Sequence, residues 1–501
     1  MSAAPRRFGI DRATRNLAVF ALALADRALS FGYEIAKVNR RSSDWGRPHT
    51  SANAETYGAG DLPADSGHAL VRDNPVAARG RQVVTARVVG RGLKPIADPR
   101  WLALWKRWAP NCYSANESPF ERVQTMAMDA CFEAGEVWAR RRWRRVGDLG
   151  WDGLPLAVPL QIELYESDQV DRLKDGPAPG GGKYVQGVEY NAIGRPVAVW
   201  FFKSHPGDLW YTGNTLESAP VPYEDLAHLF REDRPGQARG VTWLATNGPQ
   251  IRKMGIYEDT EQERKNYEAC TVGVVTNENA EPRLGDTKGR LGPAVKDALG
   301  RVLERFAPGQ ILYPEPGYRI DWNTPQPTQG YSDFLKRKEH RIAQGWGVPY
   351  YSLSGDLADV NYSAARIGDV DTRSWVRPFQ EQVLAGMFLS QIARWFTEAA
   401  LMMPKGLRGT LVDWPVEWQL PAVEEHNRVE AVDADEREVR GGFTSRAERQ
   451  RARGNDPAKL LDVIEAEARD LEKRKIKLDS DPNSTTRAGA IQTKQDAAPV
   501  A

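Results

Sequence analysis

The chain has 501 residues, of which 41% are hydrophobic and 27% are charged, so it can bury one or more cores and its length suggests roughly two to four domains. Lysine and arginine number 68 against 67 aspartates and glutamates, which leaves a formal net charge of +1. This near-neutral balance excludes a protein whose whole surface binds nucleic acid tightly, so any DNA contact has to be local or weak.

The N-terminal segment imitates a secretory signal. Several arginines precede the apolar run 17–25, which ends in the A-x-A sequence of a cleavage site. The apolar pattern continues to Tyr33, however, and this favours a helix on a globular surface over a leader that is removed. No later segment approaches the ~20 apolar residues of a membrane span, so we expect a soluble chain with no membrane partner.

Order is expected to begin near Leu70. Residues 37–68 are rich in Ser, Asn, Gly and Ala and show no periodicity, which predicts a linker or an arm laid over a neighbouring subunit. The run 70–89 predicts a helix that stops at Gly90. Ser118 to Glu121 have the pattern of a capping box with proline at the first helical position, which predicts a helix ending near Ala134.

Strand-forming residues follow this helix. Alternation from Val137, a glycine-rich turn at 147–153 and the run 156–164 predict a hairpin. Residues 187–203 predict a second hairpin after a loop rich in Pro and Gly. Five arginines interleaved with Trp143 lie in the first hairpin at 140–145, where alternate residues face opposite sides of a strand. A solvated or inter-subunit surface is favoured for them over a DNA contact.

A polar helix is predicted from Pro249 to about Cys270, and it is too polar for a core helix. A compact α/β insert follows, with strands at 271–276 and 310–322 around a helix at 293–306. A basic helix at 334–344 then returns the chain. Its spacing places Leu335, Ile342 and Trp346 on one side and Lys336, Arg337, His340 and Gln344 on the other.

A polar loop rich in Gly and Ser occupies 345–362 before a long helix at 363–401. Two further helices are expected at 423–440 and 457–475, and the polar composition beyond 479 predicts disorder. The chain also has sixteen tryptophans, which core packing and subunit interfaces explain equally well.

The sequence offers no candidate site for catalysis or for metal binding. Gly180 to Lys183 resemble part of a phosphate loop, but Pro177 stands where a glycine is needed and Tyr184 where Ser or Thr would bind magnesium. The six histidines lack metal-binding spacing. Three widely separated cysteines predict reduced core thiols in a cytosolic setting: Cys112, Cys131 and Cys270. We therefore expect no enzyme, no cofactor and no metal site.

Three short motifs carry a family resemblance: Gly345-x-Gly347-Val348-Pro349, Leu353-Ser354-Gly355-Asp356 and Asn361-Tyr362-Ser363-x-x-Arg366. The polar helix and the basic helix form two struts on either side of the α/β insert. Together with this order of strut, insert, strut and loop, the motifs resemble the lambda-type portal family of tailed bacteriophages from about residue 70 to about 471. The resemblance implies an α+β, multi-domain portal fold that forms a ring oligomer. The implied parts are an N-terminal arm and linker (1–69), the first part of a wing (70–242), a stem helix (243–270), a clip (271–329), a second stem helix (330–347), a tunnel loop (348–362), a long wing helix with the wing remainder (363–419), a crown (420–478) and a disordered tail (479–501).

The resemblance also implies a function. The protein would form a ring, a dodecamer in the family, at one vertex of the virion capsid, with assembly in the host cytoplasm. It would conduct double-stranded DNA without sequence preference during packaging and ejection. Implied partners are the terminase, head-completion or adaptor proteins, and the major capsid and scaffold proteins. Another ring-shaped head–tail connector and, at lower weight, a packaging terminase enzyme remain the alternatives.

Two groups of residues follow as site candidates. Those for the DNA channel lie on the basic helix and at the end of the loop: Lys336, Arg337, His340, Asn361 and Tyr362. Those for partner docking lie on the helix expected in the clip: Lys296, Arg301, Glu304 and Arg305.

Overall fold

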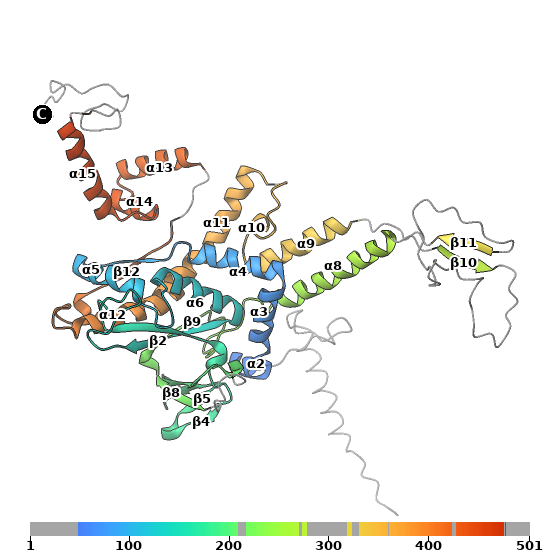
Figure 1. The fold of residues 1–501 in the computed structure, drawn as a ribbon, viewed down its shortest axis with the longest axis horizontal. Helices are drawn as coiled ribbons and strands as arrows, with labels where there is room; N and C mark the ends of the chain where they lie inside the picture. Colours follow the sequence, from blue (N-terminus) through green and yellow to red (C-terminus); the bar gives the residue numbers. More distant parts are fainter. Residues whose placement is uncertain are drawn as a thin grey trace, which may run out of the picture. The chain divides into compact units, whose positions relative to one another are not determined.

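A computed structural model describes residues 49–208, 217–269, 273–277, 318–322, 330–358, 360–422, 427–474 and 476. The chain divides into two units, Met1–Glu55 and Thr56–Ala501, and the second contains the fold. It mixes helices with antiparallel sheets, as expected from the sequence (Figure 1). None of the helices in these ranges is both long and apolar enough to cross a bilayer.

Helices begin earlier than expected. Helix α2 (Ala52–Ala59) and helix α3 (Leu62–Asp73) occupy part of the segment that was expected to be a linker. The sequence was misleading because α3 packs through small residues, Ala64 and Gly67, besides Val71. A Cβ atom at Gly67 would lie 2.0 Å from the carbonyl oxygen of Glu133, so only glycine allows α3 to approach α6 this closely.

The expected helix at 70–89 is two helices. Helix α3 ends at Asp73, and α4 (Pro75–Val88) begins after Asn74, whose side chain accepts hydrogen bonds from the N–H groups of Val76 and Ala77. The break follows from Pro75, which cannot donate the hydrogen bond that would continue α3. The predicted stop at Gly90 is confirmed, with φ of +53°.

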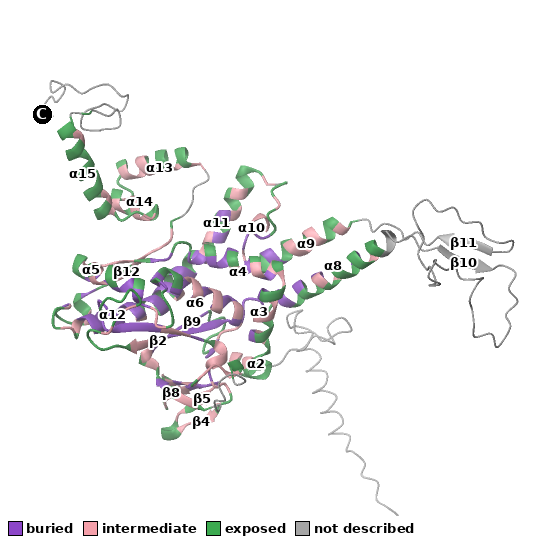
Figure 2. Ribbon diagram, viewed as in Figure 1, coloured by how far each residue is buried: buried purple, intermediate pink, exposed green. Residues whose placement is uncertain are grey.

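A three-stranded sheet lies at the centre of the fold, in the order β3 (Leu160–Glu166), β2 (Glu136–Trp143), β9 (Leu226–Phe230). The predicted hairpin between β2 and β3 is confirmed. Helices α6 (Phe120–Ala134) and α12 (Ser390–Leu401) pack against one face through Val137, Ala139 and their neighbours. Figure 2 shows the burial of these facing surfaces in purple.

The other face of this sheet packs on a second sheet. Trp138 and Tyr165 point to that side and join a small core with Val199 and Phe201. The second sheet has the order β4 (Gly176–Pro177), β5 (Lys183–Val185), β6 (Val188–Tyr190), β7 (Pro196–Phe202), β8 (Ser218–Pro222). The predicted hairpin at 187–203 is its β6–β7 pair. Because β2 is covered on both faces, its first four residues are buried.

Tryptophans form much of the helical core. Helix α5 (Pro99–Trp108) carries Trp101, Trp105 and Trp108 on one face, and their rings pack against Phe120 and Phe396. Their indole groups find acceptors: the Nε1 of Trp101 donates to Thr397 Oγ1 at 2.9 Å and that of Trp108 to the Leu160 carbonyl at 2.7 Å. Within one subunit, core packing therefore explains these three tryptophans.

The long helix predicted at 363–401 is confirmed in its extent, but it is not uniform. Helix α11 (Tyr362–Pro378) passes into a π-helix, η7 (Phe379–Leu389), and then into α12. Pro378 lies at this transition and lacks the N–H that a regular α-helix needs, which accounts for a change of winding there.

The predicted capping box at Ser118 is wrong, because its hydroxyl donates to Asn116 Oδ1 and Pro119 occupies the N-cap position.

Among the remaining elements, the strands β10 and β11 and the helices α13 and α15 were expected from the sequence, whereas β1, β12 and α14 were not. The short sheet of β1 (Lys94–Ile96) and β12 (Glu417–Gln419) closes the helical core. Strands β10 (Gly273–Asn277) and β11 (Tyr318–Trp322) pair antiparallel, while the helix expected at 293–306 lies outside the described residues. The C-terminal helices have no buried residue and are α13 (Arg428–Arg440), α14 (Arg446–Ala452) and α15 (Pro457–Arg474). Short helical turns are η2 (Ala109–Asn111), η3 (Ser167–Gln169), η4 (Pro179–Gly181), η5 (Pro206–Asp208), η6 (Tyr223–Asp225) and η8 (Leu411–Asp413).

A fully buried carboxylate connects the sheet to the segment that leads into the next helix. Glu136 accepts hydrogen bonds from His228 Nε2 at 2.8 Å, the Gly240 N–H at 2.8 Å and Arg239 Nε at 2.5 Å. Burial alone would raise the pKa of Glu136, but the Arg239 charge and these hydrogen bonds outweigh it and lower the pKa to about 2. Burial also lowers the pKa of His228, so its neutral ring donates to Glu136.

Replacing Glu136 with Gln should destabilise the protein by about 3 to 5 kcal/mol at pH 7, because Arg239 would remain buried without its counter-charge. In the wild type, the stability that Glu136 contributes should be present above pH 4.5 and be lost as the pH falls towards 2, since its folded pKa is depressed. Guanidinium unfolding followed by tryptophan fluorescence measures both effects. The exposed Glu117→Gln variant is the control, and equal stability of the two variants would contradict this role.

Candidate functional site

Two helices form the strut expected from the sequence. Helix α8 (Gly248–Ala269) and helix α9 (Tyr331–Gly345) pack against each other (Figure 1). Tyr257 of α8 contacts Tyr331 and Phe334 of α9, with ring centroids 5.9 and 5.0 Å apart. Only the first turns of α8 reach the core, through Ile251 and Met254. From 255 to 266 α8 is largely polar and half-buried or exposed apart from the buried Glu261, in agreement with its composition.

Helix α9 has the two faces that its spacing predicts. Ile342, Ala343 and the following Trp346 are buried, and Leu335 packs partly against the same core. On the opposite side, Arg337, His340 and Gln344 are exposed, while Lys336 is half-buried. The predicted separation of packing and polar faces is therefore confirmed, whereas the orientation of the polar face towards a channel is not tested by one subunit.

The turn after α9 is fixed by close backbone packing. Asn247 donates from Nδ2 to the Ile342 carbonyl at 3.0 Å, and a Cβ atom at Gly345 would lie 2.2 Å from its Oδ1. Gly347 has φ of +66°, and a Cβ there would lie 2.7 Å from Nε1 of Trp375, which donates to the Gly347 carbonyl. Glycine is thus required twice, once for space and once for both space and conformation.

The expected tunnel loop at 348–362 is partly helical. Helix α10 (Tyr350–Ser354) begins after Pro349 and ends at Gly355, which has φ of +76°. Arg79 donates to the Ser352 carbonyl at 3.1 Å, so α4 anchors this helix. Tyr351 adds a hydrogen bond to Asp369 of α11 at 3.1 Å. The first half of the expected loop is therefore helical, because contacts from α4 and α11 stabilise a helical turn there.

The second half of the segment leads directly into α11. Leu357 is exposed, and Asn361 is the N-cap of α11, where its Oδ1 accepts from the Ala364 N–H at 2.8 Å. Tyr362 is half exposed at the first position of that helix. Capping occupies one side-chain atom of Asn361, which adds a structural role to this residue. Its expected contact with DNA stays a prediction, as does that of Tyr362.

The basic residues of α9 differ in whether an acidic residue pairs with them. The ammonium group of Lys336 lies 3.1 Å from Asp356 Oδ2. The Ala358 N–H and this ammonium hold the pKa of Asp356 below its usual range, so the pair stays charged. Arg337, by contrast, is exposed and forms no ion pair with any residue that the structure describes. His340 stacks on Tyr350 with ring centroids 3.9 Å apart.

A cavity of about 370 Å³ lies between α9 and α11 and is lined by His340, Arg341, Gln344, Val348 and Asp371 among others. His340 therefore belongs both to the polar face of α9 and to the lining of this cavity. The sequence did not single out Arg341, nor Asn247 and Trp375, because the contacts of the latter two with the glycine turn join residues about 30 to 100 positions apart.

The remaining candidates are the docking residues expected in the clip and the arginine cluster at 140–145. The docking residues Lys296, Arg301, Glu304 and Arg305 lie outside the described residues. In the arginine cluster, Arg141 pairs with Asp225 and Glu398, and Arg142 pairs with Glu163. Arg144 donates to Gln161 at 2.8 Å. These partners within the same subunit favour a structural role for the cluster over a DNA contact, whereas the sequence had favoured a solvated or inter-subunit surface.

Comparison with known proteins identifies related sequences. A family model described as phage portal protein, lambda family, matches residues 38–380. The probable portal protein of Halomonas phage phiHAP-1 is 24% identical over 323 residues, which cover 63% of this chain and 58% of that protein. The portal protein of Escherichia phage N15 is 21% identical over 399 residues, covering 71% of this chain and 72% of that protein. The chain therefore spans less than two thirds of the Halomonas phage relative.

Two solved structures are similar at low identity. A chain in the neck of a native gene transfer agent particle matches 83% of this chain and 98% of its own length, with 15% identity and a TM-score of 0.46. The HK97-family phage portal protein of Corynebacterium diphtheriae matches 73% of this chain and 97% of its own length, with 10% identity and a TM-score of 0.33.

A pair of glycine variants tests the fixed turn. Gly347→Ala and Gly355→Ala both place a side chain at positive φ, which costs about 1 to 2 kcal/mol. Only Gly347→Ala also displaces Trp375, whereas a Cβ at Gly355 meets nothing within 4 Å. We expect Gly347→Ala to destabilise the protein by a further 1 to 3 kcal/mol, roughly the cost of overpacking. Urea unfolding measures this difference. Equal effects of the two variants would show that the contact with Trp375 does not restrain the turn.

Proposed function

The chain belongs to the lambda family of phage portal proteins, and from this premise we propose that it forms a closed ring at one vertex of a virion capsid, through which double-stranded DNA passes during packaging and ejection. The match over residues 38–380 carries this proposal, because it includes residues 70–242, which we assign to the first part of the wing, both strut helices and the turn that joins them to α11. The protein would act as a conduit and not as an enzyme.

An exposed apolar surface on α11 supports assembly into a ring. The helix buries Asp369, Thr372 and Val376 on one side. At 100° per residue, Ile367 and Val370 point away from that side, and their exposed fractions are 70% and 57%. Apolar residues in such a position are typical of a surface that another protein covers. We assign this surface to the neighbouring copy of the chain, in a ring that the family makes a dodecamer.

The basic face of α9 is the proposed channel surface. Arg337 is its strongest candidate, since its charge is not compensated by any described residue, whereas Lys336 is already paired with Asp356. Phosphate contacts of this kind fix position and read no sequence, which suits a conduit. His340 contributes from the same face. Asn361 and Tyr362 would approach the DNA at the end of the segment 355–361, which follows the anchored helix α10.

The remaining partners are proposed from the family alone. The terminase, and later head-completion or adaptor proteins, would dock on the clip at 271–329, with Lys296, Arg301, Glu304 and Arg305 as contact candidates. Major capsid and scaffold proteins would surround the ring in the virion, after assembly in the host cytoplasm.

Charge on the apolar surface of α11 should prevent assembly. The double variant Ile367→Asp/Val370→Asp should reduce the ring fraction at least about tenfold at micromolar concentration, because buried unpaired carboxylates oppose association. Native mass spectrometry and negative-stain imaging measure the ring fraction. Val412→Asp, at a residue that is 88% exposed, is the matched control. Rings of the double variant at wild-type yield would place the subunit contact elsewhere.

Removal of the unpaired charge on α9 should weaken the salt dependence of DNA binding. Each phosphate neutralised contributes about −0.9 to the slope of log K against log salt concentration. Rings of Arg337→Ala should therefore bind duplex DNA with a shallower slope, while the exposed Lys106→Ala variant keeps the wild-type slope. Fluorescence anisotropy at several salt concentrations gives both slopes. A wild-type slope for Arg337→Ala would show that Arg337 does not face the DNA.

A further inference from the structure

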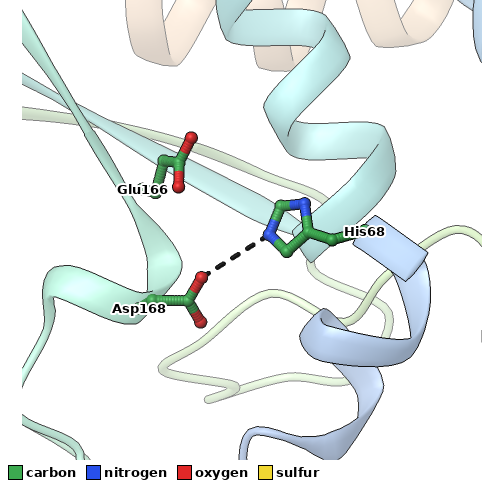
Figure 3. A group of neighbouring side chains, drawn as sticks. All are labelled: His68, Glu166 and Asp168. Carbon is green, nitrogen blue, oxygen red and sulfur yellow. Dashed lines mark ion pairs between the residues drawn. The ribbon is translucent and has the colours of Figure 1, made fainter. Parts of the chain in front are cut away.

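A histidine and two carboxylates meet between the helical layer and the edge of the central sheet. His68 lies on α3, Glu166 is the last residue of β3, and Asp168 lies in the helical turn η3. One nitrogen and two oxygen atoms of these side chains all lie within 4.8 Å of one another. Figure 3 shows the imidazole and the two carboxylates converging on a common space.

The imidazole of His68 is oriented by a fourth residue. Its Nδ1 lies 2.9 Å from Glu133 Oε2, and Arg81 donates to the other oxygen of that carboxylate at 2.5 Å. Its Nε2 atom is buried and makes no hydrogen bond within the described part of the chain. A carboxylate that receives the Nδ1 proton while Nε2 remains available is the usual outer-shell arrangement of a metal-binding histidine.

The carboxylates are also positioned before any ligand arrives. The side chain of Glu166 accepts from the backbone N–H of Gln169, and Gln169 returns a hydrogen bond to the Glu166 N–H at 3.0 Å. Asp168 Oδ2 lies 3.5 Å from His68 Nε2. Two ligands of a tetrahedral ion with bonds of about 2.1 Å are roughly 3.4 Å apart, so this separation fits two ligands of one ion better than a direct hydrogen bond.

A second histidine stands beside the cluster. His205 Nε2 lies 3.4 Å from Glu166 Oε2 and 3.9 Å from Asp168 Oδ2. Its Nδ1 accepts a hydrogen bond from the Gly207 N–H at 3.0 Å, so in the neutral ring Nε2 carries the proton and is a donor to the carboxylates. His205 therefore presents an N–H group to the carboxylates and is not a ligand in this arrangement.

We propose that His68 Nε2, Glu166 and Asp168 bind one divalent transition-metal ion, with zinc as the best match and with the fourth position open to water. An imidazole nitrogen favours zinc and its neighbours over magnesium or calcium, which prefer oxygen ligands alone. The ion would connect α3 to β3 and η3, and hence the helical layer to the sheet edge. The two carboxylates would also lose part of their mutual repulsion. This site is independent of ring formation and of DNA passage.

Isothermal titration of tag-free, full-length protein with ZnCl2, at pH 8 and after treatment with a chelator, tests the site. We expect one zinc ion per chain for the wild type. Glu166→Gln and Asp168→Asn should each weaken binding at least about tenfold, since even outer-shell changes cost 10- to 100-fold in metal affinity. His68→Ala should weaken it most. His49→Ala, which removes an exposed histidine, should bind as the wild type does, and magnesium should not compete.

Glu166 decides the result if the His68 variant does not fold, because its side chain is 54% exposed and the change to Gln preserves its shape. X-ray absorption at the zinc edge should detect one imidazole at about 2.0 to 2.1 Å together with oxygen ligands. Absence of saturable one-to-one binding would overturn the proposal. So would unchanged affinity in Glu166→Gln and Asp168→Asn, or a zinc spectrum without imidazole. In either case rings and DNA binding would be unaffected, which separates this outcome from a failure of the proposed function.

Discussion

The structure depends above all on the buried carboxylate of Glu136. Its charge is accommodated only because donors from β9, from the segment 239–240 and from the start of η3 reach it at the same time. A buried charge without partners costs several kcal/mol, so arrangements that lose one of these donors are strongly disfavoured. The network thereby joins the central sheet to the segment that leads into α8. The strut of α8 and α9 therefore starts from a segment that this network holds against the sheet.

At the base of the strut the constraint is one of space and not of charge, and glycine residues satisfy it. At Gly345 and Gly347 the backbone comes so close to Asn247 and Trp375 that no side chain fits. Gly80 does the same for the ring of Trp346, which a Cβ would approach to 2.3 Å. Helices α4, α8, α9 and α11 therefore meet at a rigid junction.

Local patterns predicted much of this organisation. The β2–β3 hairpin, the polar helix α8 and the two faces of α9 follow from hydrophobic periodicity, which acts over a few residues. Helix α3 was missed because Ala64 and Gly67 pack as well as large residues when the partner is a backbone, and small residues carry no periodic signal. The segment after Pro349 was predicted as a loop, and distant contacts from Arg79 and Asp369 make its first half helical.

The sequence by itself determined the family, the type of most elements and the face of α9 that carries charge, since each depends on residues that are close together in the chain. Tertiary structure alone decided the partners of those charges. It paired Lys336 with Asp356, left Arg337 without a partner among the described residues, and placed the arginines of β2 against acids from distant elements. It also brought His68 to Glu166 and Asp168 across about 100 positions. Such pairs are invisible in the sequence because only folding makes distant side chains neighbours.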